Sequence, residues 1–388
     1  MTVHDAEDMQ ADELMKRVRQ AVPTLLEHAA QTELALRPTP QSRQAARAAG
    51  AFALMTPRRF GGLGADRATI VRVLAELGRG CPSTAWVAAT SAEAQTLAAP
   101  LMPEELLKEF YADPDVRLCG VGEPLGAARQ VPGGLRFSGR WGYASGCEDS
   151  PWTLLLVAVT DDGTLRRLAP VLVPTSALRI DRTWDVMGLR GTGSHSLAAD
   201  DVFVPDSHVL DLPTGPDGLP DPSVRPEAHL SNACYVLSPM LGAAQGALDV
   251  VSAALHTRKP PLSEHDSLAA SASARQLFAQ AAHRVGGARD RVLRVAEHLD
   301  RYADTGALSE LDRAALTMDI VTAARQCRTS VDELVDLHGS SGLAAGNPLQ
   351  RFWRDLQVGT RHAQLNPYLA VEDYGLLLAA SLKEGGQR

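Results

Sequence analysis

The stretch LRFSGRWGYASGCEDSPWTLLLVAVTDDGTLRRLAPVLVPTSALRIDRTWDVMGLRGTGSHSLAADDVFVP, which runs from Leu135 to Pro205, decides the fold of this chain. Short apolar and β-branched runs alternate in it with turn signals, such as Asp161-Asp162-Gly163 and the Gly-rich segment Gly188–Gly193. This spacing is typical of strands joined by tight turns, and it predicts a small antiparallel sheet. The strands are expected at Thr153–Val159, Leu168–Val173, Leu178–Trp184 and Ser196–Val204.

Helical segments are expected on both sides of this stretch, because apolar residues recur there at intervals of three and four. Pro23 is expected to kink or split the first helix, and Asp211–Pro226 to form a linker. The expected helices are Asp12–Gln31, Ser42–Ala49, Arg67–Arg79, a helix entered at Cys81–Thr84 that runs through Leu97, Pro103–Tyr111, Pro239–Thr257, Asp266–Tyr302, Ser309–Leu337 and Pro348–Leu382, the last interrupted at Pro367.

The order of helices, then strands, then helices indicates an α+β fold. We expect an N-terminal helical domain over residues 1–113, a central antiparallel β-domain over 114–225 and a C-terminal helical bundle over 226–388. A chain of 388 residues with 45% apolar content is ample for a large core.

Charge and composition exclude several classes of function. The net charge of -8 argues against a nucleic acid or an anionic membrane as the main partner. No apolar run approaches the ~20 residues that a membrane span needs, and the acidic start lacks the apolar core of a signal peptide. The five cysteines are widely spread without a CxxC pair, which favours free thiols in a reducing compartment. A cytoplasmic location is therefore expected.

Common catalytic motifs are missing from the sequence. It holds no P-loop, no GxSxG elbow and no HExxH pair, and no metal site is expected. The Gly-rich segments Gly61–Gly64 and Gly339–Gly346 do not follow a predicted strand, which argues against a dinucleotide-binding βαβ unit. Residue patterns alone thus predict an α+β protein without a self-evident catalytic cluster.

Two motifs in the central stretch carry a family resemblance. WDVMGLRGTGSHSLAADDVFVP (Trp184–Pro205) resembles the sheet-domain signature of the acyl-CoA dehydrogenase superfamily, and FSGRWGYASGCEDSPW (Phe137–Trp152) resembles the two-component flavin-dependent monooxygenases of that fold. PRRFGGLGAD near residue 60, CPSTAWV at 81–87 and GSSGLAAGNPLQRFWRDLQVGTRHAQLN at 339–366 agree with this branch. The resemblance implies that the C-terminal domain is a four-helix bundle.

The choice of branch depends on one residue type. The dehydrogenases carry a carboxylate base in the loop after an Arg-Asp pair, but here Arg354-Asp355 is followed by LQVGTRHAQLN, which has no acidic residue. Beside the family arginine, here Arg258, a second known place for that base holds Lys259. His362 lies where the monooxygenases carry a histidine. The resemblance therefore implies an oxygen-inserting enzyme rather than a dehydrogenase.

The reaction that the resemblance implies uses reduced flavin (FADH2 or FMNH2) from a separate flavin reductase, and O2 as co-substrate. The expected substrate is an aromatic or polycyclic small molecule, in secondary metabolism such as antibiotic biosynthesis. N-oxygenation of an amine or amino sugar, acyl-CoA dehydrogenase-like oxidation, and a flavin-free relative that keeps the fold for protein contacts are the alternatives. Arg258 is followed by KPPLSE rather than the dehydrogenases' RxxFG, which leaves FMN open beside FAD. The family's habit implies a homotetramer.

The resemblance also assigns site residues. His362, as an imidazole titrating near neutrality, would take a proton from the substrate or hydrogen-bond to it, and the Ser145 hydroxyl would limit loss of the activated oxygen as hydrogen peroxide. Packing by His362 and a turn role for Ser145 are the structural alternatives. Trp86 would line the flavin pocket or belong to the core. The residues implied in cofactor binding are Trp141, Ser145, Thr192, Ser194, Arg258, Gly339, Ser340 and Trp86.

Overall fold

The computed structural model describes residues 3–213, 226–302 and 308–385, and these divide into two compact units. Unit 1 consists of Met1–Ala65, Ser83–Val186 and Arg190–Asn232, and unit 2 of Asp66–Pro82, Met187–Leu189 and Ala233–Arg388. The three domains expected at 1–113, 114–225 and 226–388 stay a prediction. Most of the expected linker Asp211–Pro226 lies outside the described residues.

A six-stranded sheet forms the centre of unit 1, with strand order β4-β3-β1-β2-β6-β5. Its strands are β1 (Leu118–Val131), β2 (Gly134–Ala144), β3 (Trp152–Asp161), β4 (Thr164–Pro174), β5 (Arg179–Asp181) and β6 (His195–Pro205). Neighbouring strands are antiparallel except β1 and β3, which run parallel with Leu118 opposite Trp152. The predicted sheet is confirmed, but its purely antiparallel pattern is corrected to a mixed one by this pair.

The turn between β3 and β4 follows the chemistry of its residues. Asp162 and Gly163 both have positive φ, at 48° and 77°, and Asp161 pairs with Thr164 across the turn. A two-residue turn of this kind matches the right-handed twist of the strands, and Asp-Gly is among the pairs that adopt it most readily. The predicted hairpin is confirmed.

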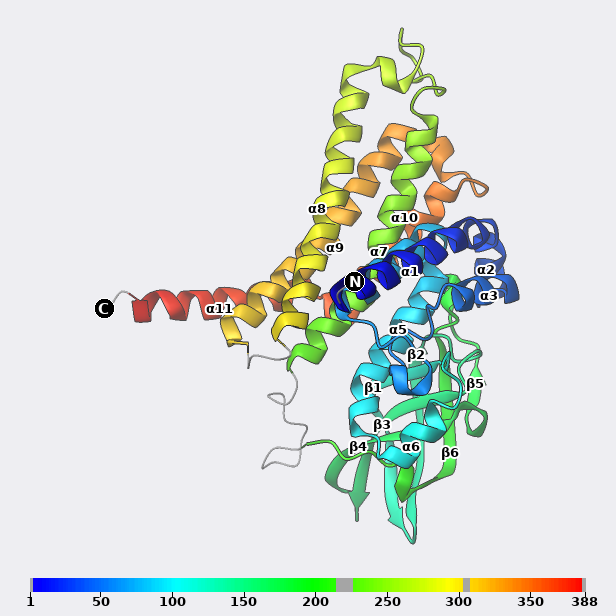
Figure 1. Cartoon of the computed structure of the whole chain (residues 1–388), viewed down its shortest axis with the longest axis vertical. Coiled ribbons are helices and arrows are strands. Elements are labelled where there is room, and N and C mark those ends of the chain that lie inside the picture. The colour runs from blue at the N-terminus through cyan, green and yellow to red at the C-terminus, as the bar shows by residue number, and fades with distance from the viewer. Residues whose placement is uncertain (1–2, 214–225, 303–307, 386–388) are drawn as a thin grey trace. The chain divides into compact units, whose positions relative to one another are not determined.

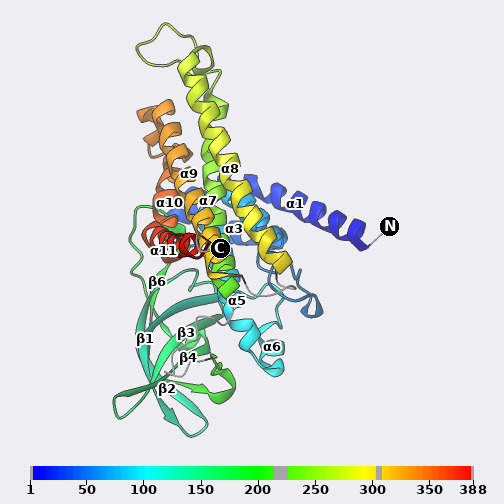
Figure 2. The same ribbon diagram turned by 90° about the vertical axis from the view of Figure 1, so that its left-hand side faces the viewer.

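Two apolar clusters cover the sheet, each involving different residues of the same strands. The first includes Phe137 and Trp141 of β2 with Leu155 and Val157 of β3. The second joins Leu118, Leu154 and Leu172 of the sheet to α5 (Pro82–Ala98) and α6 (Glu104–Phe110), which lie beside it in both views (Figures 1 and 2). The sheet thus fixes where α5 lies, and α5 carries Trp86.

Three further helices belong to unit 1, namely α1 (Val3–Glu27), α2 (Ala29–Ala35) and α3 (Pro40–Ala48). α1 continues through Pro23 and ends at Glu27, so the break falls five residues after the proline. Val18 and Leu25 on either side of Pro23 are fully buried, and their packing offsets the hydrogen bond that the proline lacks. The turn from α2 into α3 carries Leu36 in a left-handed conformation with φ of 55°.

Unit 2 consists mainly of helices, and its long helices α8 and α9 pack antiparallel (Figure 2). A Cβ added to Gly78 would lie 2.4 Å from the Pro239 carbonyl oxygen, and one on Gly242 would lie 2.0 Å from that of Ala75. These glycines therefore let α4 and α7 approach closely. The helices are α4 (Arg67–Gly80), α7 (Pro226–Ala254, which begins in unit 1), α8 (Ala272–Tyr302), α9 (Glu310–His338), α10 (Pro348–Gly359) and α11 (Pro367–Gly385).

Two expectations from composition can be compared with the structure. Residues Glu227–Ala254 are long and apolar enough to cross a membrane, but 83% of their most apolar window is buried, as in the core helix of a folded protein.

All five cysteines are free and buried, which confirms the predicted free thiols. Burial raises the pKa of Cys147 to about 11 and that of Cys327 to about 12.

Candidate functional site

Three hydroxyl groups form a continuous chain at the end of β2. Ser145 Oγ lies 2.8 Å from Ser194 Oγ, which in turn lies 2.7 Å from Thr192 Oγ1. The Trp86 indole N–H of α5 donates to Ser145 Oγ over 3.3 Å. We call Thr192, Ser194 and Ser145 the hydroxyl chain. The structure thus brings together four of the residues that the sequence proposed for the flavin site.

Glycine conformations make this arrangement possible. Gly146 and Gly193 take positive φ angles of 71° and 53°, which turn the backbone sharply next to Ser145 and Ser194. The Gly146 N–H then donates to the Thr192 carbonyl over 2.8 Å and joins the two loops directly. Two segments almost 50 residues apart in sequence therefore present their hydroxyls to each other.

The hydrogen-bonding capacity of Ser145 is partly used. A serine hydroxyl offers one proton and two lone pairs, and the Trp86 N–H occupies one lone pair. Thr192 and Ser194 are buried, whereas Ser145 is partly exposed. When Ser194 donates to Ser145, the second lone pair is used as well, and the Ser145 proton remains for a ligand. Hydrogen bonds in such a chain strengthen one another.

Trp141 takes a different position from the one expected. Its side chain is 0% exposed within the sheet core, its ring meets Phe137 edge to face, and its N–H donates to the Leu156 carbonyl over 3.2 Å. A ligand could not reach this side chain without opening the core. The observed role of Trp141 is packing, so we leave it out of the proposed flavin contacts.

Tyr143 is a residue that the sequence analysis missed. It is 77% exposed, lies two residues before Ser145 and has a positive φ of 59°, which is strained for a tyrosine. Its ring packs edge to face against Trp184 at 5.8 Å between centroids. An exposed aromatic ring two residues before Ser145 in the sequence offers a stacking surface for a planar ligand. No sequence pattern signals it, because only a structure reveals the left-handed backbone.

His362 lies in unit 2, in the turn between α10 and the short helix η8 (Ala363–Leu365). Its backbone N–H donates to the Gly359 carbonyl, and its backbone carbonyl accepts from the Leu365 N–H. Burial lowers the pKa of His362 to about 4. The expected titration near neutrality is therefore wrong, because a desolvated imidazole resists protonation. At neutral pH the ring is uncharged and can accept or donate a hydrogen bond.

The carboxylate closest in sequence to His362 on α10 has a structural role. Asp355 is buried and accepts a hydrogen bond from the Leu189 N–H over 2.6 Å. Gly188 packs against the same part of α10, where an added Cβ would lie 2.1 Å from the Arg354 carbonyl oxygen. Asp355 is thus committed to a backbone contact within unit 2.

A group of residues around Arg258 in unit 2, the Arg258 cluster, contains three other predicted residues. A Cβ added to Gly339 would lie 3.8 Å from one Arg258 guanidinium nitrogen. Gly339 has a φ of 77°, and Ser340 follows it in the sequence. Among the described residues Arg258 has no ion pair. Burial and the Arg258 charge lower the pKa of His338, another residue missed from sequence. An unpaired guanidinium beside a glycine turn suits a phosphate group.

Within the described ranges, no group of three His, Cys, Asp or Glu side chains is placed to hold a metal ion. The hydroxyl chain fits the polar edge of a flavin ring, and the Arg258 cluster fits a phosphate. His362 belongs to unit 2, as the Arg258 cluster does, whereas the hydroxyl chain belongs to unit 1.

Comparison with protein families gives two matches. The acyl-CoA dehydrogenase N-terminal domain matches residues 5–103, and the acyl-CoA dehydrogenase C-terminal domain matches residues 235–367. These two matches include α5 with Trp86, and the segments with Arg258, Gly339 and His362. The hydroxyl chain lies in the part between them.

Similar proteins cover nearly the whole chain. The flavin-dependent monooxygenase oxygenase subunit HsaA of Rhodococcus jostii is 31% identical over 93% of this chain and 97% of its own length. The oxygenase component of the FADH2-dependent resorcinol hydroxylase of a Rhizobium species is 34% identical, over 91% of this chain and 90% of its own. The solved structure of XiaF from a Streptomyces species, in complex with FADH2 and glycerol, superimposes with a TM-score of 0.89 at 31% identity and covers 97% of both chains.

Proposed function

We propose a reaction for this chain from one premise, namely that it belongs to the acyl-CoA dehydrogenase family, in the branch of the oxygenase subunits of two-component flavin-dependent monooxygenases. The proposed enzyme takes reduced FAD from a separate reductase, takes O2 from solution and hydroxylates an aromatic small molecule. Bound reduced flavin would supply the electrons that activate O2. The chain's own residues would bind and orient the flavin and the substrate, and would exclude water from them.

The hydroxyl chain is the observation that carries this proposal. Ser145 would donate its proton to the polar edge of the flavin, because Trp86 and Ser194 can fill both lone pairs of its oxygen. A hydroxyl held in one direction would hydrogen-bond to the flavin ring edge and so help limit loss of the activated oxygen as hydrogen peroxide. Tyr143 would support one face of the ring by stacking.

His362 would act on the substrate as a neutral imidazole. With a pKa of about 4 it accepts a hydrogen bond from a phenol or similar group and draws electron density toward the aromatic carbon. Asp355 is buried and accepts the Leu189 N–H, so its carboxylate is poorly placed to act as a base on a substrate. This distribution of groups favours oxygen insertion over acyl-CoA dehydrogenation.

We assign the phosphate end of the flavin to the second cluster. Arg258 would meet the cofactor phosphates beside Gly339 and Ser340, and in this family such an arginine often comes from a neighbouring subunit. FAD rather than FMN is supported by two relatives, because the resorcinol hydroxylase is FADH2-dependent and XiaF was solved with FADH2.

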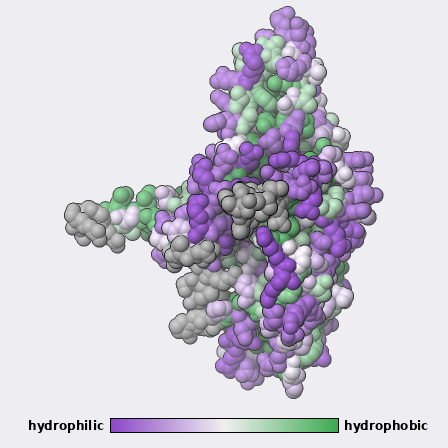
Figure 3. Space-filling view, viewed as in Figure 1, coloured by the Kyte–Doolittle hydropathy of each residue, from purple (hydrophilic) through white to green (hydrophobic). Residues whose placement is uncertain are grey.

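Self-association, in the form of a homotetramer, is supported by α11. This helix bears exposed apolar side chains along its length, and Figure 3 shows hydrophobic residues on the surface that it forms. Apolar patches of this kind mark interaction surfaces. The residues are Tyr368 at 82%, Leu369 at 57%, Val371 at 52%, Leu376 at 71% and Leu382 at 70% exposure. We further propose a cytoplasmic enzyme of secondary metabolism.

The decisive experiment mixes the protein anaerobically with photoreduced FAD and then adds isotope-labelled O2 with an aromatic probe, resorcinol or indole-3-acetate. We expect labelled oxygen in the hydroxylated probe by mass spectrometry, and less hydrogen peroxide than from free reduced FAD. Reduction of a dye by an acyl-CoA, without label in any aromatic probe, would instead favour a dehydrogenase.

A further inference from the structure

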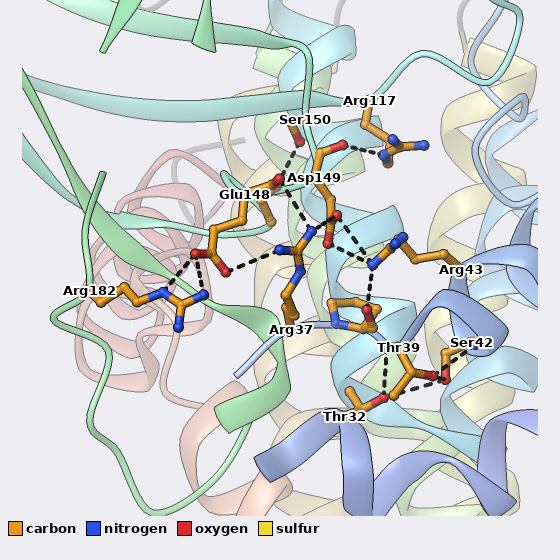
Figure 4. Close-up of polar contacts among 12 residues, drawn as sticks. Thr32, Arg37, Thr39, Ser42, Arg43, Arg117, Glu148, Asp149, Ser150 and Arg182 are labelled. Atoms are coloured by element: carbon orange, nitrogen blue, oxygen red, sulfur yellow. Dashed lines mark hydrogen bonds and ion pairs between the residues drawn. The ribbon is translucent and has the colours of Figure 1, made fainter. Parts of the chain in front are cut away.

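The turn between α2 and α3, far from the candidate site in sequence, meets the loop that carries Ser145. The Arg37 guanidinium pairs with Asp149 in a very short contact and lies 3.9 Å from Glu148, while Arg43 lies 3.3 Å from Asp149 (Figure 4). Arg182 holds Glu148 from the other side at 2.7 Å. We call Arg37, Arg43, Glu148, Asp149 and Arg182 the Arg37 clasp.

The two carboxylates of the clasp are largely removed from water. The Asp149 side chain is only 7% exposed, and the Arg117 Nε–H donates to the Asp149 backbone carbonyl over 2.7 Å. Arg43 also donates to the Pro38 carbonyl over 2.8 Å, which ties the pair to the turn itself. Ion pairs at exposed sites contribute little, but breaking a largely buried pair leaves an uncompensated charge. The clasp therefore resists opening.

The same turn also packs against the second loop of the hydroxyl chain. A Cβ on Gly191 would lie 2.4 Å from Thr32 Cγ2, and one on Gly193 would lie 2.5 Å from the Leu36 carbonyl oxygen. Thr192 lies between these two glycines, and Ser194 follows. The turn thus contacts the loop that carries Ser194 by close packing, and the loop that carries Ser145 by ion pairs.

A third set of bonds closes the arrangement between the two loops. The Gly146 N–H donates to the Thr192 carbonyl, Cys147 Sγ lies 3.6 Å from the Gly193 carbonyl oxygen, and Ser150 Oγ donates to the Gly146 carbonyl over 3.0 Å. All three segments belong to unit 1. Movement of any one of them would change the spacing of the hydroxyls.

We infer that Arg37 and Asp149 are positioning residues, which hold Ser145 within hydrogen-bond distance of Ser194 and Trp86 and so fix the direction of the proton offered to reduced flavin. The role of this proton rests on the proposed function. The clasp itself touches no reacting atom. Its effect on flavin would therefore pass through the hydroxyl chain, and the double-mutant cycle below tests whether Ser145 carries it.

Asp149→Asn tests the clasp without ligand. The variant removes the charge that Arg37 and Arg43 share, and loosening of the loop should raise the maleimide labelling rate of buried Cys147 about tenfold. Peptide mass spectrometry reads each cysteine separately, so Cys234 and Cys327 serve as internal references. Arg37→Lys keeps the positive charge but not the guanidinium shape, so it should raise the labelling rate of Cys147 by a smaller factor. This second variant keeps the test possible if Asp149→Asn does not fold.

A matched control exists on β6. Asp201 also meets two arginines, Arg129 at 3.0 Å and Arg136 at 3.1 Å, but its side chain is 55% exposed. Asp201→Asn should leave Cys147 labelling unchanged. Equal labelling of Cys147 in the Asp149→Asn and Asp201→Asn variants would overturn the inference.

A double-mutant cycle tests whether the effect passes through Ser145. In the wild-type background, Asp149→Asn should weaken anaerobic binding of FADH2 about threefold to tenfold, and in a Ser145→Ala background it should add nothing. An equal loss in both backgrounds would contradict the positioning role. Labelling of Cys147 involves no flavin, so a wild-type protein that hydroxylates no probe would end the proposed function and leave the labelling result standing.

Discussion

The loop that carries Ser145 and the turn that carries His362 are built by different physical means. Hydrogen bonds and ion pairs fix the first, since Trp86, Ser194 and the Arg37 clasp all act on it. Burial dominates the second, and its main effect is to keep the imidazole neutral. The comparison teaches that the hydroxyl chain of unit 1 would direct a proton, whereas burial in unit 2 sets the basicity of the His362 imidazole. The predictions below separate these two roles.

The largest effect is expected for His362→Ala. Loss of the only proposed group that acts on substrate should lower the rate of product formation by about 10²–10⁴-fold, the usual contribution of a general base or acid. Binding of FADH2 should be unchanged. Product yield per O2 consumed, measured with resorcinol or indole-3-acetate, checks this. Normal yield in the variant would remove His362 from the reaction.

A smaller effect is expected for Ser145→Ala, which deletes the proton donor but leaves His362 intact. The fraction of O2 lost as hydrogen peroxide should rise, with yield falling by about tenfold, as for one hydrogen bond to a charged or reactive group. Catalase-coupled oxygen uptake measures this loss. Ser138→Ala, at an exposed position of β2, the strand that precedes Ser145, is the control.

The burial of His362 also predicts a pH dependence of stability. The folded pKa of about 4 lies below the unfolded value of about 6.5, so the unfolded chain binds more protons between these limits. Stability from this group is complete above about pH 6.5 and is lost as pH falls toward 4. His362→Gln should flatten this part of the profile of urea midpoint against pH. An unchanged slope would mean that the ring is not buried in solution.

The smallest effect is expected for Tyr143→Asn. Asparagine tolerates positive φ better than tyrosine, so stability should stay equal or rise by about 0.5–1 kcal/mol. Loss of the ring should weaken FADH2 binding about threefold, as for one stacking contact. Thermal melting and anaerobic titration measure the two quantities. Unchanged affinity would show that Tyr143 is only a surface residue.

Local chemistry made much of the fold predictable. The β3–β4 hairpin follows from an Asp-Gly turn between apolar runs, and α9 follows from its apolar period after Ser309, which caps the helix by accepting from the Asp312 N–H. β2 was missed, and so was β1, because Gly120, Gly122, Pro124 and Gly126 interrupt its strand pattern. Its parallel pairing with β3 is a long-range contact that no local pattern records.

The candidate site divides in the same way. Ser145, Thr192, Ser194 and Trp86 were found through family motifs, and the structure brings them together. Arg37 was missed, because it lies outside every quoted motif and 112 positions separate it from Asp149. Asp149 lies within the motif at 137–152, but the motif by itself gives it no role. The pKa of His362 could not be foreseen either, since desolvation depends on packing that a sequence does not show.

The burial of the cysteines has a consequence for an enzyme that handles O2. Sulfur is oxidised chiefly as thiolate, and burial keeps Cys119 and Cys147 protonated by raising their pKa values. Escaping peroxide would therefore meet sulfur that is both shielded and unreactive, even two residues from Ser145. The fold thereby protects the catalyst from damage by its own by-product.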